Sequence, residues 1–438
     1  MKLKKSSKKN FKIIKMLGVW TLVSLVLQLG LYSALNYKVN KVLNPDIQAE
    51  TPVVQTLKAT VPGANLENVQ LSYEKDYLAY MENGILKVFN LKSNKVVFEK
   101  EQPTDDMDGL GVLGYQWLPD RNTLIYFYGK KNPTPVTTKT TTVTVPVESN
   151  SSNSSNSSNS NSGTSSGTFG SEDPNSPAKE KKQETREETR TQTIYHNKRL
   201  VDLYTLEFPE SDDETPADDR YNITLEENMF PDGANVKGLV ISTFTNLIYL
   251  SLESENSMKL VEIDVMKDAS TLNKSGETIG NMVASDRHGT LYIESKIGSK
   301  QQILALWDNE RQVVVKDGAN SVLLGDREGK LYIGEIENGH LVQIKQAEEN
   351  KDHNPLEFST FWEGSIPYTD DTKVLIGKRG QIVIYDTHTA YVVENKQEKT
   401  ISLSGDESYI SPDGLQLAEF THKGDSIDVE LKPLDTKK

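Results

Sequence analysis

The chain has no cysteine, only 6 histidines among 438 residues, and almost no helical periodicity after residue 45. Without cysteine it forms no disulfide, no thiolate metal site and no thiol nucleophile, and no lipid can be attached through sulfur. An oxidising compartment is compatible with this composition but is not required by it. The length suits one large domain or two ordinary ones, so the chain is long enough to bury a sizeable core.

The positive charge of the chain is concentrated at its start. Seven lysines and no acidic residue lie within residues 1–15, so the other 423 residues carry 42 basic and 63 acidic side chains, a net charge of −21. A body this acidic repels nucleic-acid phosphates and anionic lipid surfaces. We therefore expect no nucleic-acid partner.

A run of 20 uncharged residues, 16–35, follows the lysine-rich start. At about 1.5 Å per residue, a helix of this length spans about 30 Å, the hydrocarbon thickness of a bilayer. The lysines favour a cytoplasmic N-terminus by the positive-inside rule, which places the rest of the chain outside the cytoplasm. We expect a cytoplasmic basic tail over 1–15 and one transmembrane helix over 16–35, that is, a single-pass protein of the cell membrane.

A cleaved signal peptide is the competing interpretation of the same run. Its apolar core is usually about 7–15 residues long and ends in a small-x-small site. This run is longer, and Tyr32 is too bulky for the −3 position of such a site. A buried helix of a soluble domain is a third interpretation, which fits the lysine block poorly. Residues 36–65 contain three prolines and show no sustained period, so we expect a stalk there.

Two closely similar segments, Asp286–Ile293 and Asp326–Ile333, lie 40 residues apart. A fixed period of this size indicates a repeat architecture. In both segments a turn with Asp and Gly leads into an apolar strand. The same pattern recurs along the chain, and its strands begin at positions 78, 124, 247, 291, 331, 374 and 417. The intervals are 40 to 46 residues long, except for one of 123.

Tight turns join the short strands of each repeat. Asn83-Gly84 and Asn338-Gly339 each separate two alternating apolar segments, which is the strongest short-range signal of a β-hairpin. About four short strands in a unit of about 40 residues are typical of propeller blades. At Ser411-Pro412-Asp413-Gly414, which precedes such a strand, the chain resembles TolB-like and WD-like propeller repeats.

The resemblance covers residues 66–435 apart from an insertion, 132–193, and implies an all-β fold, a β-propeller of about seven four-stranded blades. Six or eight blades stay open. No repeat has the ordered signature of WD repeats, Gly-His followed by Trp-Asp, which favours the TolB-like form. A pair of β-sandwiches is the alternative fold. The resemblance implies little about activity, because a fold does not fix a function.

The long interval contains an insertion, residues 132–193. It begins after the strand Leu124–Tyr128 and ends before Leu200–Phe208, so it replaces the turn between two strands of one blade. Three compositionally biased segments lie in it: 133–147 (Thr, Val and Pro), 149–162 (Ser and Asn only) and 178–190 (charged). Such composition buries too little apolar surface to offset chain entropy, so we expect disorder. The insertion is either a neutral expansion or a tether, a wall-contacting stalk or a glycosylated arm.

The sequence contains no assembled catalytic motif. Gly163–Gly167 matches G-x-S-x-G, but that motif needs a strand before it and a helix after it, and here it lies in a Ser/Asn tract. His288 and His340 would matter only if the fold brought them together in the central channel. The acidic segments 105–109 and 207–219 offer oxygen ligands to calcium, but solvated loops explain them better. We therefore assign no catalytic, cofactor-binding or metal-binding residue and no cofactor.

The remaining candidate residues are three tryptophans, Trp117, Trp307 and Trp362, which we interpret as blade-packing aromatics rather than a sugar platform. Together these observations favour a membrane-anchored extracytoplasmic propeller that is a non-catalytic binding or scaffolding module of a bacterial cell envelope. Its partner would be an envelope protein, a peptide or a wall polymer.

The alternative function is a hydrolase or lyase acting on wall glycan or peptide, with its site in the central channel. Carboxylates clustered with His or Arg at the channel would favour the enzyme, whereas an apolar or evenly polar channel would favour binding. A sensor that passes binding inward is a third interpretation. Its tail of fifteen residues has no room for a signalling domain, so it would need a membrane partner.

Overall fold

The computed structural model describes residues 56–434, except 105–106, 108, 147–184, 210–215, 256 and 265. Residues 57–438 form one compact unit. The expected transmembrane segment, 16–35, lies outside the described residues. Within the described ranges, no helix has the length and apolar character needed to cross a bilayer.

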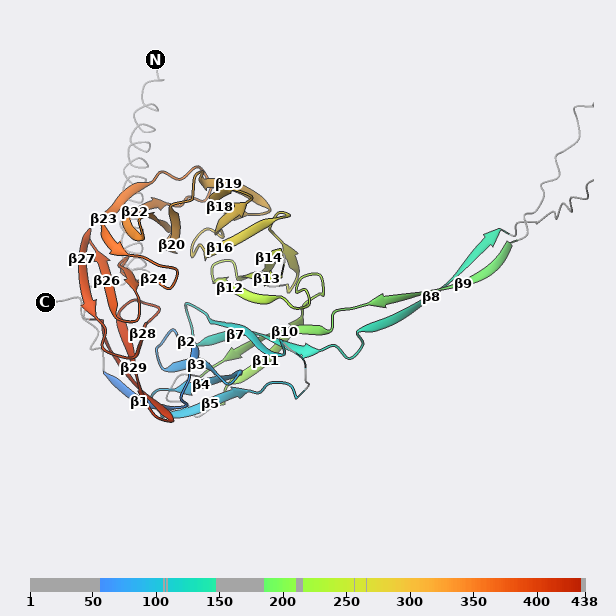
Figure 1. Cartoon of the computed structure of the whole chain (residues 1–438), viewed down its shortest axis with the longest axis horizontal. Helices are drawn as coiled ribbons and strands as arrows, with labels where there is room; N and C mark the ends of the chain where they lie inside the picture. Colours follow the sequence, from blue (N-terminus) through green and yellow to red (C-terminus); the bar gives the residue numbers. More distant parts are fainter. Residues whose placement is uncertain are drawn as a thin grey trace, which may run out of the picture. The chain divides into compact units, whose positions relative to one another are not determined.

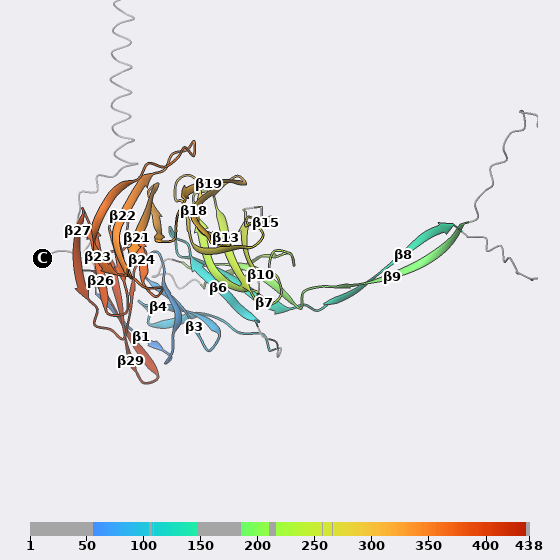
Figure 2. The same ribbon diagram turned by 45° about the horizontal axis from the view of Figure 1, so that its top comes forward.

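Seven four-stranded antiparallel sheets are arranged as blades around a common axis (Figures 1 and 2). The fold is therefore an all-β, seven-bladed propeller, which confirms the predicted fold class and blade number. In each blade the first strand lies nearest the axis, and the others follow outward.

The strands of the first four blades are, from the axis outward: blade 1, β2 (Glu67–Leu71), β3 (Tyr77–Glu82), β4 (Ile85–Asn90), β5 (Lys95–Lys100); blade 2, β6 (Gly111–Trp117), β7 (Thr123–Lys131), β10 (Arg199–Glu207), β11 (Asp218–Thr224); blade 3, β12 (Asn235–Ser242), β13 (Leu247–Ser254), β14 (Ser257–Ile263), β15 (Ala269–Thr271); blade 4, β16 (Glu277–Ala284), β17 (Leu291–Ile297), β18 (Lys300–Trp307), β19 (Glu310–Val315). The remaining blades are: blade 5, β20 (Ser321–Arg327), β21 (Lys330–Glu337), β22 (His340–Glu348), β23 (Ser359–Pro367); blade 6, β24 (Lys373–Ile376), β25 (Ile382–Tyr385), β26 (Thr389–Glu394), β27 (Gln397–Ser402); blade 7, β28 (Glu407–Ile410), β29 (Gln416–Lys423), β30 (Ser426–Pro433), β1 (Leu57–Pro62).

The hydrophobic core lies between neighbouring blades. A second strand is covered on both faces, by the blade before it and the blade after it, so it consists of consecutive apolar residues instead of alternating ones. On β7, residues 124–127 are all at most 8% exposed. This is why the repeat was visible in the sequence: six of the seven predicted strand starts fall on second strands.

The exception among the predicted strand starts is position 374, which lies on β24, the innermost strand of blade 6. The second strand of that blade is β25, whose residues Ile382, Val383 and Ile384 are completely buried. β24 and β25 are each only 4 residues long, so their two apolar segments look alike in the sequence.

The ring is closed by the N-terminal strand. β1 pairs antiparallel with β30 and becomes the outermost strand of blade 7, with Val61 opposite Ile427. The expected stalk, 36–65, therefore includes a strand of the propeller. The expected start of the propeller at residue 66 is corrected to Leu57, where β1 begins. Ala59 and Val61 are buried, whereas Lys58, Thr60 and Pro62 are exposed, as expected for an outer strand packed on one face.

The insertion lies between β7 and β10, the second and third strands of blade 2, which pair directly with each other. At its two ends the structure corrects the expected disorder of 132–193. β8 (Val136–Pro146) and β9 (Thr185–Tyr195) form a two-stranded antiparallel ribbon that leads away from the blades (Figure 1). Thr and Val are β-branched and favour strands even where they bury little surface, a preference that the compositional argument left out. Residues 147–184 lie outside the described residues.

Candidate functional site

The two ends of the propeller differ in which turns they carry. Because the strands of a blade alternate in direction, the turns between first and second strands all emerge at one end, which we call the rim end. The turns between second and third strands emerge at the other end, together with the blade-to-blade links. The β8–β9 ribbon rises there, so we call it the ribbon end.

At the rim end, neighbouring turns are joined by hydrogen bonds and an ion pair. Side chains of the repeated Ser- and Asp-containing turns contact the turn of the next blade at five places: Glu74 N to Asn122 Oδ1 (3.1 Å), Lys75 Nζ to Asp413 Oδ2 (2.6 Å), Gln381 Nε2 to Gly414 O (3.1 Å), Ser242 Oγ to Ser285 O (3.2 Å) and Glu328 N to Asp286 Oδ2 (2.8 Å). The repeated turn motif is thus accounted for by contacts between blades.

A pair of half-buried carboxylates of blade 5 lies at this rim, on the side that faces blade 4. Asp326 accepts a hydrogen bond from the backbone N–H of Asp286 (3.1 Å), and Glu349 accepts one from Ser285 Oγ (2.5 Å). The second oxygens of both carboxylates, Asp326 Oδ2 and Glu349 Oε1, have no hydrogen-bond partner among the described residues. Burial, and then the charge of Glu349, raise the pKa of Asp326 to about 9, so Asp326 is protonated at neutral pH.

This pair predicts that stability falls as the pH rises. The folded-state pKa of Asp326 is above its ordinary value. Between about pH 4 and pH 9 the folded chain therefore keeps a proton that the unfolded chain has already released. Asp326→Asn supplies that hydrogen permanently, and we expect it to raise the free energy of unfolding at pH 8. At pH 4 the gain should vanish. Urea unfolding at both pH values measures this, with exposed Glu337→Gln as the control; a gain that is equal at both would contradict it.

The central channel holds a cavity of about 450 Å³ between the inner strands of five blades. Its lining consists of small, apolar and neutral polar residues and two lysines: Asn68, Val69, Gln70, Leu113, Gly114, Tyr115, Gln116, Val236, Lys237, Gly238, Leu239, Lys373 and Tyr409. Among the described residues that line it there is no carboxylate, histidine or arginine. Its lysines and tyrosines can exchange protons, and its convergent polar groups are of the kind that bind a ligand.

Several of the polar groups in this lining are held by neighbouring strands. Gln70 Nε2 donates to the carbonyl of Tyr115 (3.0 Å), and Trp117 Nε1 donates to the carbonyl of Gln70 (3.2 Å). The hydroxyl of Tyr115 donates to the carbonyl of Asn68 (2.5 Å). These bonds join blades 1 and 2, so this part of the wall is fixed before any ligand arrives.

The side chain of Lys373 lies over two tyrosine rings at the channel wall. Its ammonium lies 4.3 Å from the ring centre of Tyr409 and 6.0 Å from that of Tyr385. Burial lowers the pKa of Lys373, and the charge of Glu407 partly opposes this. Glu407 in turn accepts a hydrogen bond from the hydroxyl of Tyr409 (2.7 Å). An anionic group interacts more strongly with a partly desolvated ammonium on a channel wall than with an ammonium on an open surface.

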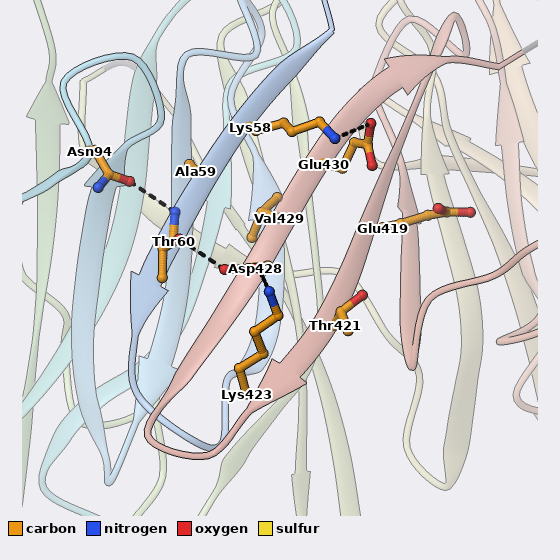
Figure 3. Close-up of a pocket in the computed structure, with 10 residues that line it drawn as sticks. All are labelled: Lys58, Ala59, Thr60, Asn94, Glu419, Thr421, Lys423, Asp428, Val429 and Glu430. Carbon is orange, nitrogen blue, oxygen red and sulfur yellow. Dashed lines mark hydrogen bonds and ion pairs between the residues drawn. The ribbon is translucent and has the colours of Figure 1, made fainter.

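A second concave surface of about 340 Å³ lies over the closing strand of blade 7 (Figure 3). Its charges are already paired: Lys58 Nζ lies 3.2 Å from Glu430 Oε1, and Lys423 forms an ion pair with Asp428. Thr60 donates to Asp428 through its hydroxyl (2.9 Å), and its backbone N–H donates to Asn94 of blade 1 (2.9 Å). These contacts hold β1 in place, so we assign this surface to closure of the ring.

The residues considered in the sequence analysis are not brought together. His288 lies in a rim-end turn of blade 4, whereas His340 begins β22 at the ribbon end of blade 5, so the two are at opposite ends of the propeller. Within the described ranges, no three His, Asp or Glu residues are placed to hold a metal ion. Gly163–Gly167 lies outside the described residues, as do Asp105, Asp106 and Asp108.

The acidic segment 207–219 is described only at its ends, where its acids are ion-paired. Glu207 and Asp218 both contact Arg220, at 2.5 and 2.6 Å, and Asp219 lies 3.0 Å from Lys100.

The three tryptophans pack within or between blades. Trp117 and Trp362 are buried, at 3% and 4% exposure. Trp307 stacks on His353, with ring centres 4.3 Å apart. The expectation of blade-packing aromatics fits these positions.

The base of the ribbon is fixed to the link between blades 2 and 3 by buried and half-buried polar side chains that sequence reasoning missed. Asn132 Nδ2 donates to the carbonyl of Asn197 (2.8 Å), and Asn197 Nδ2 donates to the carbonyls of Phe230 (3.0 Å) and Glu227 (3.2 Å). His196 Nδ1 lies 3.1 Å from Glu227 Oε1. The sequence signal that could have predicted an ordered base is the pair of asparagines and the histidine at the two ends of the insertion.

Comparisons with known proteins identify no family. No protein-family model and no curated protein matches the chain. Solved structures with a similar arrangement include the Dos1 propeller (9% identity, TM-score 0.42, covering 85% of this chain and 80% of that one). The β-propeller domain of Cps50 (Swd1) from Myceliophteria thermophila has 11% identity and a TM-score of 0.45, covering 85% and 97%.

The WD40 domain of SCAP from fission yeast is also similar, with 9% identity, a TM-score of 0.39 and coverage of 86% and 94%. All three TM-scores are below 0.5, so nothing about activity or partners follows from these structures. The assignment of the fold rests on the seven sheets of this chain.

Proposed function

We propose that this chain is a non-catalytic binding module whose ligand enters the central channel. The observation that carries the proposal is the lining of the channel cavity, which provides neutral polar groups and two lysines. A cavity with a few convergent polar groups is the usual form of a binding site. Lys373 favours a ligand with an anionic group, such as a wall polymer or the acidic segment of an envelope protein, whereas Lys237 already lies 3.6 Å from Glu253.

Replacement of Lys373 tests this proposal. A hydrogen bond to a charged group is worth about 1.5–3 kcal/mol, so Lys373→Ala should weaken binding of an anionic wall-polymer fragment or acidic peptide about tenfold or more. Calorimetric titration of the chain measures the dissociation constant. Lys378→Ala, at an exposed rim-end position outside the cavity, is the matched control. Equal affinities of the two variants, or turnover of the fragment seen by mass spectrometry, would contradict the proposal.

We also propose that the module is anchored by residues 16–35 and lies outside the cytoplasm, in a bacterial cell envelope. The support is the uncharged run of 20 residues after seven lysines. The Ser-Pro-Asp-Gly turn at 411–414 further supports a repeat of the TolB-like form.

The absence of cysteine makes the topology directly measurable. Phe244 is 60% exposed on the propeller, and Ser6 lies in the basic tail. In intact cells we expect a membrane-impermeant maleimide to label the Phe244→Cys variant and to leave the Ser6→Cys variant unlabelled until the cells are lysed. Labelling of both, or of neither, before lysis would contradict the proposed orientation.

A further inference from the structure

We propose that the β8–β9 ribbon joins two copies of this chain. In this pairing, β8 of one copy runs antiparallel to β8 of the other along its full length, and the two ribbons become one four-stranded sheet. The proposal goes beyond channel binding and does not depend on it.

The ribbon alone has too few strands to be stable by itself. It contains two strands of 11 residues, about 35 Å long, and within the described ranges neither strand pairs with anything but the other. An isolated two-stranded ribbon is at best marginally stable in water, and independent stability needs more strands together with an apolar face or a packed helix. The fixed base shown above holds the ribbon at the ribbon end, so its edges are presented to other chains.

The two edges of the ribbon differ in how they are protected. β9 carries four charged residues in a row of five, Arg186, Glu187, Glu188 and Arg190, and charged side chains are a common means of blocking edge-to-edge pairing. β8 has one charge, Lys139, among residues 136–145, and the others are Thr and Val. Thr and Val favour strands. The free edge of β8 is therefore the edge on which another strand can pair.

The cross-strand register shows what each face of the ribbon presents. One face carries seven threonines: Thr138, Thr140, Thr142 and Thr144 from β8, and Thr189, Thr191 and Thr193 from β9. The opposite face is mixed: Lys139, Thr141 and Val143 lie on it, opposite Gln192, Arg190 and Glu188 of β9.

A second copy of β8 complements the first. When all 11 residues of both strands pair, the two-fold axis passes through Thr141, and the threonine faces join, with Thr138 opposite the partner's Thr144. On the mixed face Lys139 lies opposite the partner's Val143, and Val143 pairs with Glu188 within each ribbon. Lys139 is then two strand spacings, about 10 Å between backbones, from the partner's Glu188, with only a valine between. Two such attractive Lys–Glu pairs form in each dimer.

This geometry also keeps the acidic bodies apart. In an antiparallel pair the two propellers attach at opposite ends of a sheet about 35 Å long. Charges on exposed surfaces are screened within about 8 Å at physiological ionic strength. The repulsion between two bodies of net negative charge therefore does not oppose the pairing of their ribbons.

Single-cysteine crosslinking of the full chain tests the pairing, since the natural sequence has no cysteine. Thr141→Cys places the two thiols opposite each other on the axis, where the Cα separation of paired antiparallel strands, about 4.5–5.5 Å, permits a disulfide. Arg190→Cys, at the middle of β9 and directly across from Thr141, is the matched control. After mild oxidation in membranes we expect a crosslinked dimer for the Thr141→Cys variant alone. No crosslink in either variant, or an equal yield in both, would overturn the proposal.

A charge exchange at the same position distinguishes pairing in this register from random collision. Thr141→Lys puts like charges opposite each other across the pair, and opposite Arg190 within its own ribbon, and should weaken the dimer about tenfold or more. Mixing it with differently tagged Thr141→Glu should restore a heterodimer, which a pull-down through one tag detects. The Glu variant gains a favourable neighbour in Arg190 within its own ribbon, so its ribbon stays intact. Failure of the mixture to co-purify, with a wild-type pair co-purifying, would overturn the register.

Discussion

Val61→Asp should unfold the propeller by opening its ring. Val61 is completely buried on β1, opposite Ile427, in a core cluster shared by blades 7 and 1. An aspartate there places an unpaired charge in an apolar environment, which costs about 3–5 kcal/mol or more. Because β1 is the strand that closes the ring, its loss also exposes the apolar face of β30.

Denaturant unfolding followed by tryptophan fluorescence measures this effect in a chain that begins at residue 56. Lys58→Ala is the matched control on the same strand: its side chain is 72% exposed, and its ion pair with Glu430 is a surface pair, so stability should stay close to that of wild type. A chain that begins at residue 66 lacks β1 and should fail to fold. If Val61→Asp and Lys58→Ala unfold at the same denaturant concentration, β1 does not close the ring.

The strands that could be predicted from sequence are those whose local pattern follows from their surroundings. Leu124–Phe127 on β7 is apolar throughout because both of its faces are covered, and turns such as Asn338-Gly339 need the positive φ values, 51° and 77°, that Asn and Gly accept. These features lie within a few residues of each other. The blade count followed from their regular spacing.

The features that sequence reasoning missed depend on partners far along the chain. β1 alternates over only six residues, and its partner β30 lies more than 360 residues away. The pairing of Asp326 with Glu349 has no local signature, since Asp326 lies on β20 and Glu349 follows β22 of the same blade, so the two carboxylates meet only when blade 5 forms. The channel also has no local signature in the sequence, because each inner strand contributes only a few residues to its wall. In a propeller, a binding site is a property of the closed ring.

The base of the ribbon is also predicted to depend on one residue, Arg199, the first residue of β10. Its side chain is buried, with 5% of the residue exposed, and its guanidinium donates to three backbone carbonyls: Gly109 (3.0 Å), Ala234 (2.6 Å) and Pro231 (3.5 Å). These carbonyls belong to the links that lead into and out of blade 2. Burial lowers the pKa of Arg199, and the charge of Asp232 partly opposes this.

Arg199→Met should therefore cost about 3 kcal/mol or more, because it leaves buried carbonyls without donors. Arg199→Lys keeps the charge but loses the planar fork that reaches carbonyls on both sides, so it should recover only a small part of the loss. Arg220→Met, at an exposed position on the neighbouring strand β11, should change stability little. Denaturant unfolding gives the free energies of these three variants.

Hydrogen exchange would separate a local effect of Arg199→Met from a global one. Arg199 follows directly after the ribbon, and the backbone N–H groups of Lys198 and Arg199 donate to Asp232 of the next link (2.7 and 3.1 Å). Loss of the guanidinium should therefore speed amide exchange in the links around Gly109 and Ala234 and in β9, while blades 5 and 6 stay protected at low denaturant. Faster exchange in the links with an unchanged ribbon would show that Asn132 and Asn197 hold the ribbon alone. Faster exchange in both would show that one buried arginine ties the ribbon, and any sheet that it forms, to the body of the propeller.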